Sequence, residues 1–150
     1  AGWTVMIDYA HTPAALEKTL TAVREAFPEG TRGRILTVFG CGGNRDRKKR
    51  PVMGGIAASL GDITIITSDN PRDEQPEAII DEIVAGIEPG REMYREADRA
   101  KAIRMALGMA RKGDIVIVAG KGHEEYQVVG KDRIPFSDRQ IAEDSIRGMK

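Results

Sequence analysis

Four short segments of this chain hold most of the residues suited to binding a small charged molecule. Each mixes charged or amide side chains with glycine, proline or aromatic residues, and Arg45, Arg72, Asp69 and Glu124 supply charges of both signs. An arginine guanidinium binds a carboxylate or phosphate through two parallel hydrogen bonds, whereas a carboxylate accepts hydrogen bonds from an ammonium group. The pattern therefore predicts a ligand that carries both charge signs. The four segments are 8–13 (DYAHTP), 40–46 (GCGGNRD), 69–72 (DNPR) and 120–124 (GKGHE).

Each of these segments directly follows a short apolar run. The runs at 5–7, 35–39, 63–67 and 115–119 are largely apolar on successive residues, which is typical of parallel strands covered on both faces. In a parallel sheet the carboxyl ends of the strands share one edge, and open α/β sheets bind their ligands there. We therefore expect the four segments to line a single crevice.

Helical patterns separate the apolar runs. Apolar residues recur at helical spacing within 16–27, 53–60, 79–87 and 103–110. Strands that alternate with helices imply right-handed crossovers. The predicted fold class is therefore α/β, a Rossmann-like, doubly wound, mostly parallel sheet with helices on both faces.

Local signals place several boundaries. Thr12 precedes a first-turn Pro13 and is a suitable N-cap for the first helix. Asp98 is expected to cap the helix that contains 103–110, and Gly113 to stop it. A short strand is also expected around residues 93–94.

The pattern changes after Gly120. Residues 126–129 and 133–136 flank a turn at 130–132 (GKD), which predicts an antiparallel hairpin near the C-terminus. Ser137 with Gln140 then has the spacing of a capping box, which predicts a final helix.

Composition narrows the classes of partner. Lys plus Arg and Asp plus Glu both number 23, so no global charge favours nucleic acid or an acidic membrane surface. No apolar run approaches the roughly 20 residues of a membrane-spanning helix. The single Cys41 fits a reducing compartment, and we expect a cytoplasmic protein.

The length predicts one domain over 1–150, and the opening Ala1-Gly2 without a Met indicates a piece of a longer chain.

The glycine-rich and basic segments also have structural interpretations. The glycine pairs at 42–43 and at 120 and 122 are equally consistent with strand-to-helix turns that need positive φ. Lys121 is not followed by Ser or Thr, so the chain has no P-loop. Residues 47–49 are interpreted as a solvated helix start, whereas Arg45 lies on the glycine turn itself and is favoured as a ligand contact.

The remaining polar residues leave alternatives open. His11 and His123 are as consistent with structural roles as with functional ones. Residues 69–71 are also consistent with a plain Asx turn, and Glu124 with a surface acid beside the hairpin.

Taken together, the four segments resemble the C-terminal domain of the Mur ligases, a family related to folylpolyglutamate synthetase. The resemblance covers essentially the whole chain. Its most specific part is 69–72 (DNPR), which is similar to the signature of the members that select meso-diaminopimelate over lysine. Asn44 stands where the family usually has Asp, and Arg45 is retained.

The resemblance implies an amide-forming ligase. ATP would phosphorylate the γ-carboxylate of the D-glutamate in UDP-N-acetylmuramoyl-L-alanyl-D-glutamate, and the amine of meso-diaminopimelate would attack the acyl phosphate. ATP and Mg would be bound mainly by a central domain, which is absent from this chain together with the N-terminal UDP-binding domain. The isolated domain is therefore expected to be inactive, with no catalytic residue and no metal ligand of its own.

The resemblance also implies site residues, carried over position by position. Asp8, Tyr9 and His11 would face the nucleotide when the domain closes. The residues that would bind meso-diaminopimelate are Arg45, Asp69, Asn70, Pro71, Arg72, Gly120 and Glu124.

The chemistry of the amino acid agrees with this assignment. Meso-diaminopimelate carries a carboxylate and an ammonium at each end, whereas the far end of lysine has only an ammonium. Arg72 suits the distal carboxylate, Arg45 the carboxylate near the reacting amine, and Glu124 with the Gly120 carbonyl the distal ammonium. The alternatives are a lysine-adding or folylpolyglutamate synthetase-type ligase domain, and a non-catalytic Rossmann-like module that binds amino acids.

Overall fold

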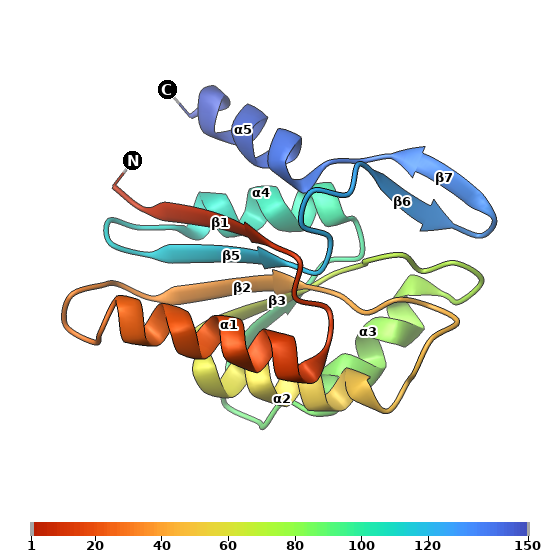
Figure 1. The fold of residues 1–150 in the computed structure, drawn as a ribbon, viewed down its shortest axis with the longest axis horizontal. Helices are drawn as coiled ribbons and strands as arrows, with labels where there is room; N and C mark the ends of the chain where they lie inside the picture. The colour runs from red at the N-terminus through yellow and green to blue at the C-terminus, as the bar shows by residue number, and fades with distance from the viewer. Residues whose placement is uncertain (1, 150) are drawn as a thin grey trace.

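The computed structural model describes residues 2–149, so Ala1 of the opening dipeptide lies outside the described residues. Its main body is a five-stranded parallel sheet with helices on both faces, and a separate two-stranded hairpin projects from the carboxyl edge of that sheet (Figure 1). In chain order the elements are β1 (Thr4–Asp8), α1 (Pro13–Ala26), β2 (Ile35–Phe39), α2 (Lys49–Leu60), β3 (Ile63–Ile66), α3 (Pro76–Val84), β4 (Glu92–Arg95), α4 (Arg99–Met109), β5 (Ile115–Ala119), β6 (Tyr126–Val129), β7 (Asp132–Pro135) and α5 (Asp138–Gly148).

The strand order β1-β5-β2-β3-β4 confirms the predicted fold class. All four pairings in this sheet are parallel, including that of the short fourth strand expected around residues 93–94. Strands β5, β2 and β3 lie inside the sheet and are buried along their whole length. The run at 5–7 also forms a parallel strand, but β1 lies at the edge of the sheet, so its residues are only partly buried.

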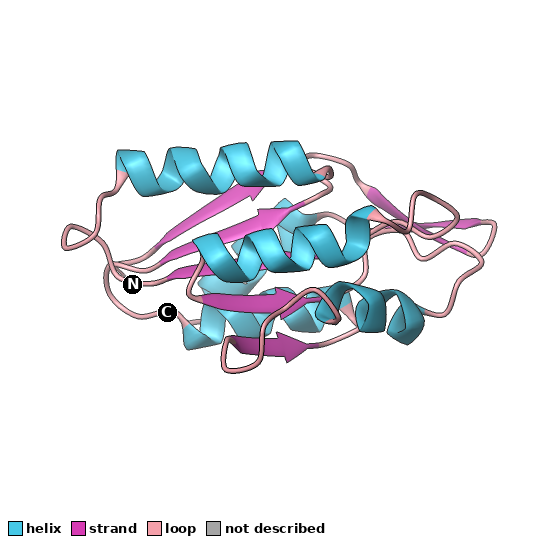
Figure 2. Ribbon diagram, turned by 90° about the horizontal axis from the view of Figure 1, so that it is seen from below, coloured by secondary structure: helices cyan, strands magenta, loops and turns pink. Residues whose placement is uncertain are grey.

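Two apolar clusters fill the space between the sheet and its helices. One joins Ile115 and Ile117 of β5 to α1, α2 and α3, and the other joins Val116 and Val118 to α4 and α5. Successive side chains of a strand point to opposite faces, so one apolar run contributes to both clusters. Figures 1 and 2 show the resulting three layers, with α1, α2 and α3 on one face and α4 and α5 on the other.

The helix starts follow the predicted caps. Thr12 accepts a hydrogen bond from the backbone of Ala15, and Asp98 accepts one from Lys101. Ser137 accepts one from Gln140, but the Gln140 side chain donates to Asp144 instead of returning to the cap. The expected capping box is therefore only half formed.

Two predicted boundaries were wrong. Helix α4 ends at Met109, and Gly113, at φ +87°, lies in the turn before β5 and is not the stop of the helix. The hairpin loop contains residues 130–131 alone, because Asp132 already pairs with Val129.

A buried ion pair that the sequence pattern did not reveal fixes the start of α5. The Nε and Nη2 atoms of Arg99 donate to the two carboxylate oxygens of Asp138 over 2.7 Å each, and both side chains are fully buried. Arg99 also donates to the carbonyl oxygens of Ser68 and Ala119. The pair therefore joins α5 to the ends of β3 and β5. Among residues 2–149, no helix is long and apolar enough to cross a membrane.

Candidate functional site

The four polar segments meet at the carboxyl edge of the sheet, as their positions after the strands predicted. They enclose a cavity of about 160 Å³ that contains both cationic and acidic side chains. A larger hollow of about 480 Å³ lies along the outer face of α1, but the segments do not reach it. The cavity between the segments is therefore the candidate site. Its lining residues are Tyr9, His11, Gly42, Arg45, Lys49, Asp69, Asn70, Arg72, Gly120 and Glu124.

Arg72 is held in an unusual backbone conformation at this site. Its φ is +51°, a left-handed conformation that costs a non-glycine residue roughly 1–3 kcal/mol. Its backbone N–H donates to the Val128 carbonyl over 3.1 Å, and its carbonyl accepts from Gly130 over 2.7 Å. Strand β6 therefore fixes the backbone from which the Arg72 side chain extends.

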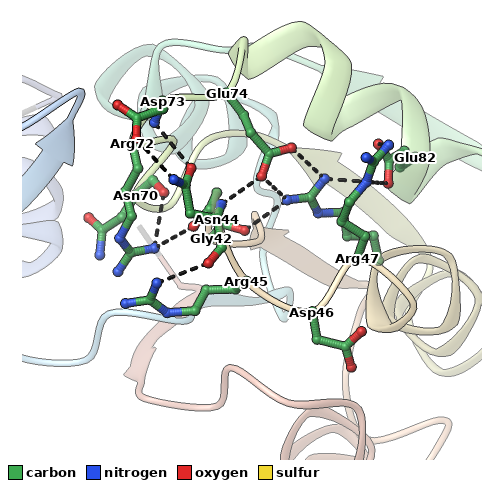
Figure 3. Close-up of polar contacts among 12 residues, drawn as sticks. Gly42, Asn44, Arg45, Asp46, Arg47, Asn70, Arg72, Asp73, Glu74 and Glu82 are labelled. Carbon is green, nitrogen blue, oxygen red and sulfur yellow. Dashed lines mark hydrogen bonds and ion pairs between the residues drawn. The ribbon is translucent and has the colours of Figure 1, made fainter.

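The Arg72 side chain is only partly used by the protein. Its Nη1 donates to the Gly43 carbonyl over 2.9 Å, while Nε and Nη2 form no hydrogen bond with any residue in the described range 2–149. Arg45 is exposed and its Nη1 donates to the Asn44 carbonyl over 3.0 Å. Figure 3 shows both guanidinium groups on the same side of the glycine turn. The two arginines can therefore present free N–H groups to an anionic ligand.

The glycine turn approaches the 69–72 segment closely. The backbone N–H of Gly43 donates to the Asn70 carbonyl over 2.7 Å, and a Cβ on Gly43 would collide with the Pro71 carbonyl. The expected positive φ was wrong for Gly42 and Gly43, which serve close approach instead. The left-handed position of this turn belongs to Asn44, at φ +55°, and asparagine tolerates that conformation better than most residues.

The second glycine pair, Gly120 and Gly122, has the positive φ that was expected for both pairs. Gly120 and Gly122 have φ values of +117° and +57°. Within the described part of the chain the Gly120 carbonyl accepts no hydrogen bond, so it remains available as an acceptor. Pro71 is buried and does not line the cavity.

A fully buried arginine supports the glycine turn. Arg50 donates to both carboxylate oxygens of Glu74 over 3.0 and 2.8 Å, and to the Gly42 carbonyl over 3.0 Å. Glu74 also accepts from the Asn44 backbone over 2.6 Å. The hydrogen bonds from Arg50 lower the pKa of Glu74 from its ordinary value near 4.5 to about 2. This ion pair therefore fixes the segment that carries Arg45.

The sequence profile of the family described as "Mur ligase, glutamate ligase domain" matches residues 1–122. The chain belongs to the Mur ligase family.

Two similar proteins agree with the family assignment, and a third shares only the fold. The UDP-N-acetylmuramoyl-L-alanyl-D-glutamate--2,6-diaminopimelate ligase of Chlorobaculum tepidum is 55% identical over 145 residues, which are 97% of this chain and 28% of that protein. A solved structure of a ligase of the same name is 39% identical with a TM-score of 0.92, over 99% of this chain and 30% of that one. E. coli FolC in complex with ADP shares the fold alone, at 21% identity and a TM-score of 0.58, over 97% of this chain and 29% of that one. The chain thus spans less than a third of these relatives.

The basic run of this Mur ligase domain has mixed roles. Arg47 forms an exposed ion pair with Glu82 at 2.6 Å, and Lys48 is exposed, as expected for a solvated helix start. The expectation was wrong for Lys49, which lines the cavity and donates to the His11 carbonyl over 3.0 Å. The cavity therefore has three cationic side chains in its lining, Arg45, Lys49 and Arg72.

In the first segment of the Mur ligase domain, Asp8 is directed away from the cavity, whereas Tyr9 and His11 lie at its rim. Asp8 accepts hydrogen bonds from Ala10 and from the Thr19 hydroxyl, so its carboxylate faces α1 and not the cavity. Tyr9 and His11 form an edge-to-face pair with ring centroids 4.8 Å apart at the rim of the cavity. Both side chains are exposed and free to contact another molecule.

The 120–124 segment contains one residue whose importance the sequence did not reveal. Lys121 is fully buried against Asp69 and Asn70, whereas His123 is exposed and lies outside the cavity lining. A lysine between two glycines has no local signal for burial, because its partners come from segments far away in the sequence. No group of three or more His, Cys, Asp or Glu side chains suited to a metal ion occurs in the described range.

Proposed function

We propose that this chain is the C-terminal, amino-acid-binding domain of a ligase that adds meso-diaminopimelate to UDP-N-acetylmuramoyl-L-alanyl-D-glutamate in peptidoglycan biosynthesis. The observation that carries the proposal is the single cavity where Arg45 and Arg72 lie with Asp69 and Glu124. Such a cavity matches a ligand with two carboxylates and two ammonium groups. The diaminopimelate ligases to which this chain is similar are named for the same substrate, which supports the proposal.

The free N–H groups define the carboxylate contacts in this proposal. Arg72 offers Nε and Nη2 to the distal carboxylate, and Arg45 takes the carboxylate next to the reacting amine. Glu124, the Gly120 carbonyl and Asp69 accept from the distal ammonium. The far end of lysine has no carboxylate and would place its ammonium near the guanidinium of Arg72. Repulsion between the two cations disfavours the binding of lysine.

Two of the site residues implied by the family resemblance, Pro71 and Asp8, do not contact the ligand in this proposal. They shape the backbone of the segments that line the cavity. Pro71 is buried, and its carbonyl lies against Gly43, so it shapes the segment that carries Arg72. Asp8 shapes the first segment through its hydrogen bonds to Ala10 and Thr19.

The nucleotide and the other substrate are placed mainly on the rest of the full-length protein. ATP and Mg are held by the central domain, and the UDP-linked precursor by the N-terminal and central domains. Tyr9 and His11 face the nucleotide when the domains close, since both are exposed at the rim of the cavity. The acyl phosphate then loses phosphate as the amine of meso-diaminopimelate forms the amide bond. A reducing cytoplasm is the compartment proposed for this reaction, consistent with the free thiol of Cys41.

The test compares amino acids in the full-length protein. We expect ATP-dependent phosphate release with the UDP-linked dipeptide and meso-diaminopimelate, and a much lower kcat/KM with lysine. A preference for lysine would favour the lysine-adding ligase, whereas amino-acid binding without turnover would favour a non-catalytic module. The 150-residue chain alone should melt cooperatively and release no phosphate under the same conditions.

A further inference from the structure

We propose that Lys121 is a positioning residue for amino-acid recognition, because its buried ammonium fixes the orientation of the Asn70 amide that faces the cavity. The inference rests on the function proposed above and adds a residue to it. Lys121 itself does not line the cavity.

The placement of Lys121 is unusual for a lysine. Its side chain is fully buried, although lysine is among the residues least often found inside proteins. The flanking Gly120 and Gly122 both have positive φ, which lets the chain turn so that the side chain between them is directed inward. Burial lowers the pKa of Lys121, so the charged form needs close partners.

The ammonium has partners from three directions. Its Nζ lies 2.8 Å from Asn70 Oδ1, 2.9 Å from the Tyr126 carbonyl and 3.2 Å from Asp69 Oδ1. Glu124 Oε1 lies farther away, at 3.9 Å. The Asp69 contact has the distance of an ion pair but not the geometry of a hydrogen bond, so the two strong hydrogen bonds are those to Asn70 and Tyr126.

These contacts determine which end of the Asn70 amide faces the ligand. Its Oδ1 accepts from Lys121 Nζ and, over 2.9 Å, from the Val128 backbone, so both acceptor positions of that oxygen are used. A flipped amide would place its N–H groups against an ammonium and a backbone N–H. Its Nδ2 forms no hydrogen bond with another residue of the described chain. Asn70 therefore presents a donor to the cavity and suits a carboxylate of the ligand, not an ammonium.

The same ammonium holds β6 against the 69–72 segment. Lys121 binds the Tyr126 carbonyl, and the next residues of β6 bind the 69–72 segment through Gln127 to the Asp69 carbonyl at 2.6 Å and Val128 to Asn70. Arg72 completes the contact by its backbone hydrogen bond to Val128. Removal of the ammonium would therefore release the orientation of Asn70 and loosen the support of Arg72 together.

The experiment measures steady-state kinetics of the full-length ligase with Lys121→Met, which keeps the length of the side chain and removes the charge. We expect the KM for meso-diaminopimelate to rise by about tenfold or more, with the KM for ATP within about twofold of wild type. The matched control is Lys112→Met, since Lys112 is exposed in the turn before β5, at the opposite edge of the sheet. It should change neither value.

Two outcomes would overturn the role of Lys121. One is an unchanged KM for meso-diaminopimelate in the folded variant, and the other is an equal rise for every substrate, which would indicate general damage. If Lys121→Met does not fold, Asn70→Asp replaces it, because aspartate keeps the oxygen that accepts from Lys121 and Val128 but lacks the Nδ2 donor. That variant should melt like wild type and show the same selective rise, and an unchanged KM would refute the orientation argument. Absence of turnover by the wild-type protein with meso-diaminopimelate would instead refute the proposed function.

Discussion

The guanidinium of Arg72 donates a hydrogen bond to the carbonyl oxygen of Gly43 over 2.9 Å, so the segment after β3 holds the segment after β2. The backbone of Gly43 returns a hydrogen bond to Asn70 in the first of these segments. Two of the four segments are therefore fixed relative to each other before any ligand enters. A site organised in this way loses less conformational freedom on binding.

Arg72 is expected to select the amino acid in the full-length ligase. Arg72→Ala should reduce kcat/KM for meso-diaminopimelate by about two to four decades, because a desolvated carboxylate loses its partner. Lysine should be affected far less, and ATP affinity should barely change. Arg72→Lys should recover only part of the loss, since an ammonium cannot reproduce the planar fork. An equal reduction for both amino acids would assign Arg72 to structure or to the shared end of the substrate.

Gly43 should tolerate no side chain. Gly43→Ala would place a Cβ against the Pro71 carbonyl and should lower the melting temperature of the chain by several degrees, about 1–3 kcal/mol. Gly108→Ala is the control, because Gly108 lies within α4 and a Cβ there meets nothing within 4 Å. The control should stabilise the chain by about 0.5–1 kcal/mol. Similar melting temperatures for the two variants would contradict the close approach of the segments.

The pair of Arg50 and Glu74 should make stability depend on pH in the acid range. The pKa of Glu74 is about 2 in the folded chain and near 4.5 ordinarily, so its stabilising effect is complete above about pH 5. The effect should fall as the pH drops from there toward 2, because protonation of Glu74 removes the charge that Arg50 binds.

Urea denaturation of wild type and Glu74→Gln at pH values between about 2 and 7 measures this effect. The difference in unfolding free energy should be largest near neutral pH and shrink toward pH 2. A difference that is constant over the whole range would show that the ion pair does not account for it.

His11 should act on the nucleotide side of the full-length ligase. His11→Ala removes the ring that packs against Tyr9 at the rim, and it should raise the apparent KM for ATP. The ratio of kcat/KM values for meso-diaminopimelate and lysine should stay as in wild type, because Arg72 and Asn70 are untouched. A large change in that ratio would place the first segment within the amino-acid pocket.

Much of the architecture could be predicted from local patterns. The apolar runs at 35–39 and 115–119 became the buried strands β2 and β5, and the polar segments after the strands met at one edge as topology requires. The conformation of Gly43 could not be predicted, because the need for a glycine there comes from the Pro71 carbonyl 28 residues later in the sequence.

The burial of two cationic side chains, Arg50 and Lys121, could not be predicted from the sequence pattern. Arg50 lies in a run of basic residues that reads as solvent-exposed, yet its partner Glu74 comes from the segment before α3. Lys121 likewise depends on Asn70, which precedes it by 51 positions. Whether a long cationic side chain is buried depends on partners distant in the sequence, and no local periodicity encodes them.

The hairpin of β6 and β7 does not join the main sheet, and β7 is exposed along its whole length. A two-stranded hairpin of this kind is marginally stable by itself, so its persistence depends on its hydrogen bonds to the 69–72 segment. Transient detachment of the hairpin would release Arg72 from its left-handed conformation and abolish the ligand site. An amino acid that binds only when the hairpin is attached lowers the population of the detached state. Occupancy of the cavity should therefore slow amide hydrogen exchange in β6.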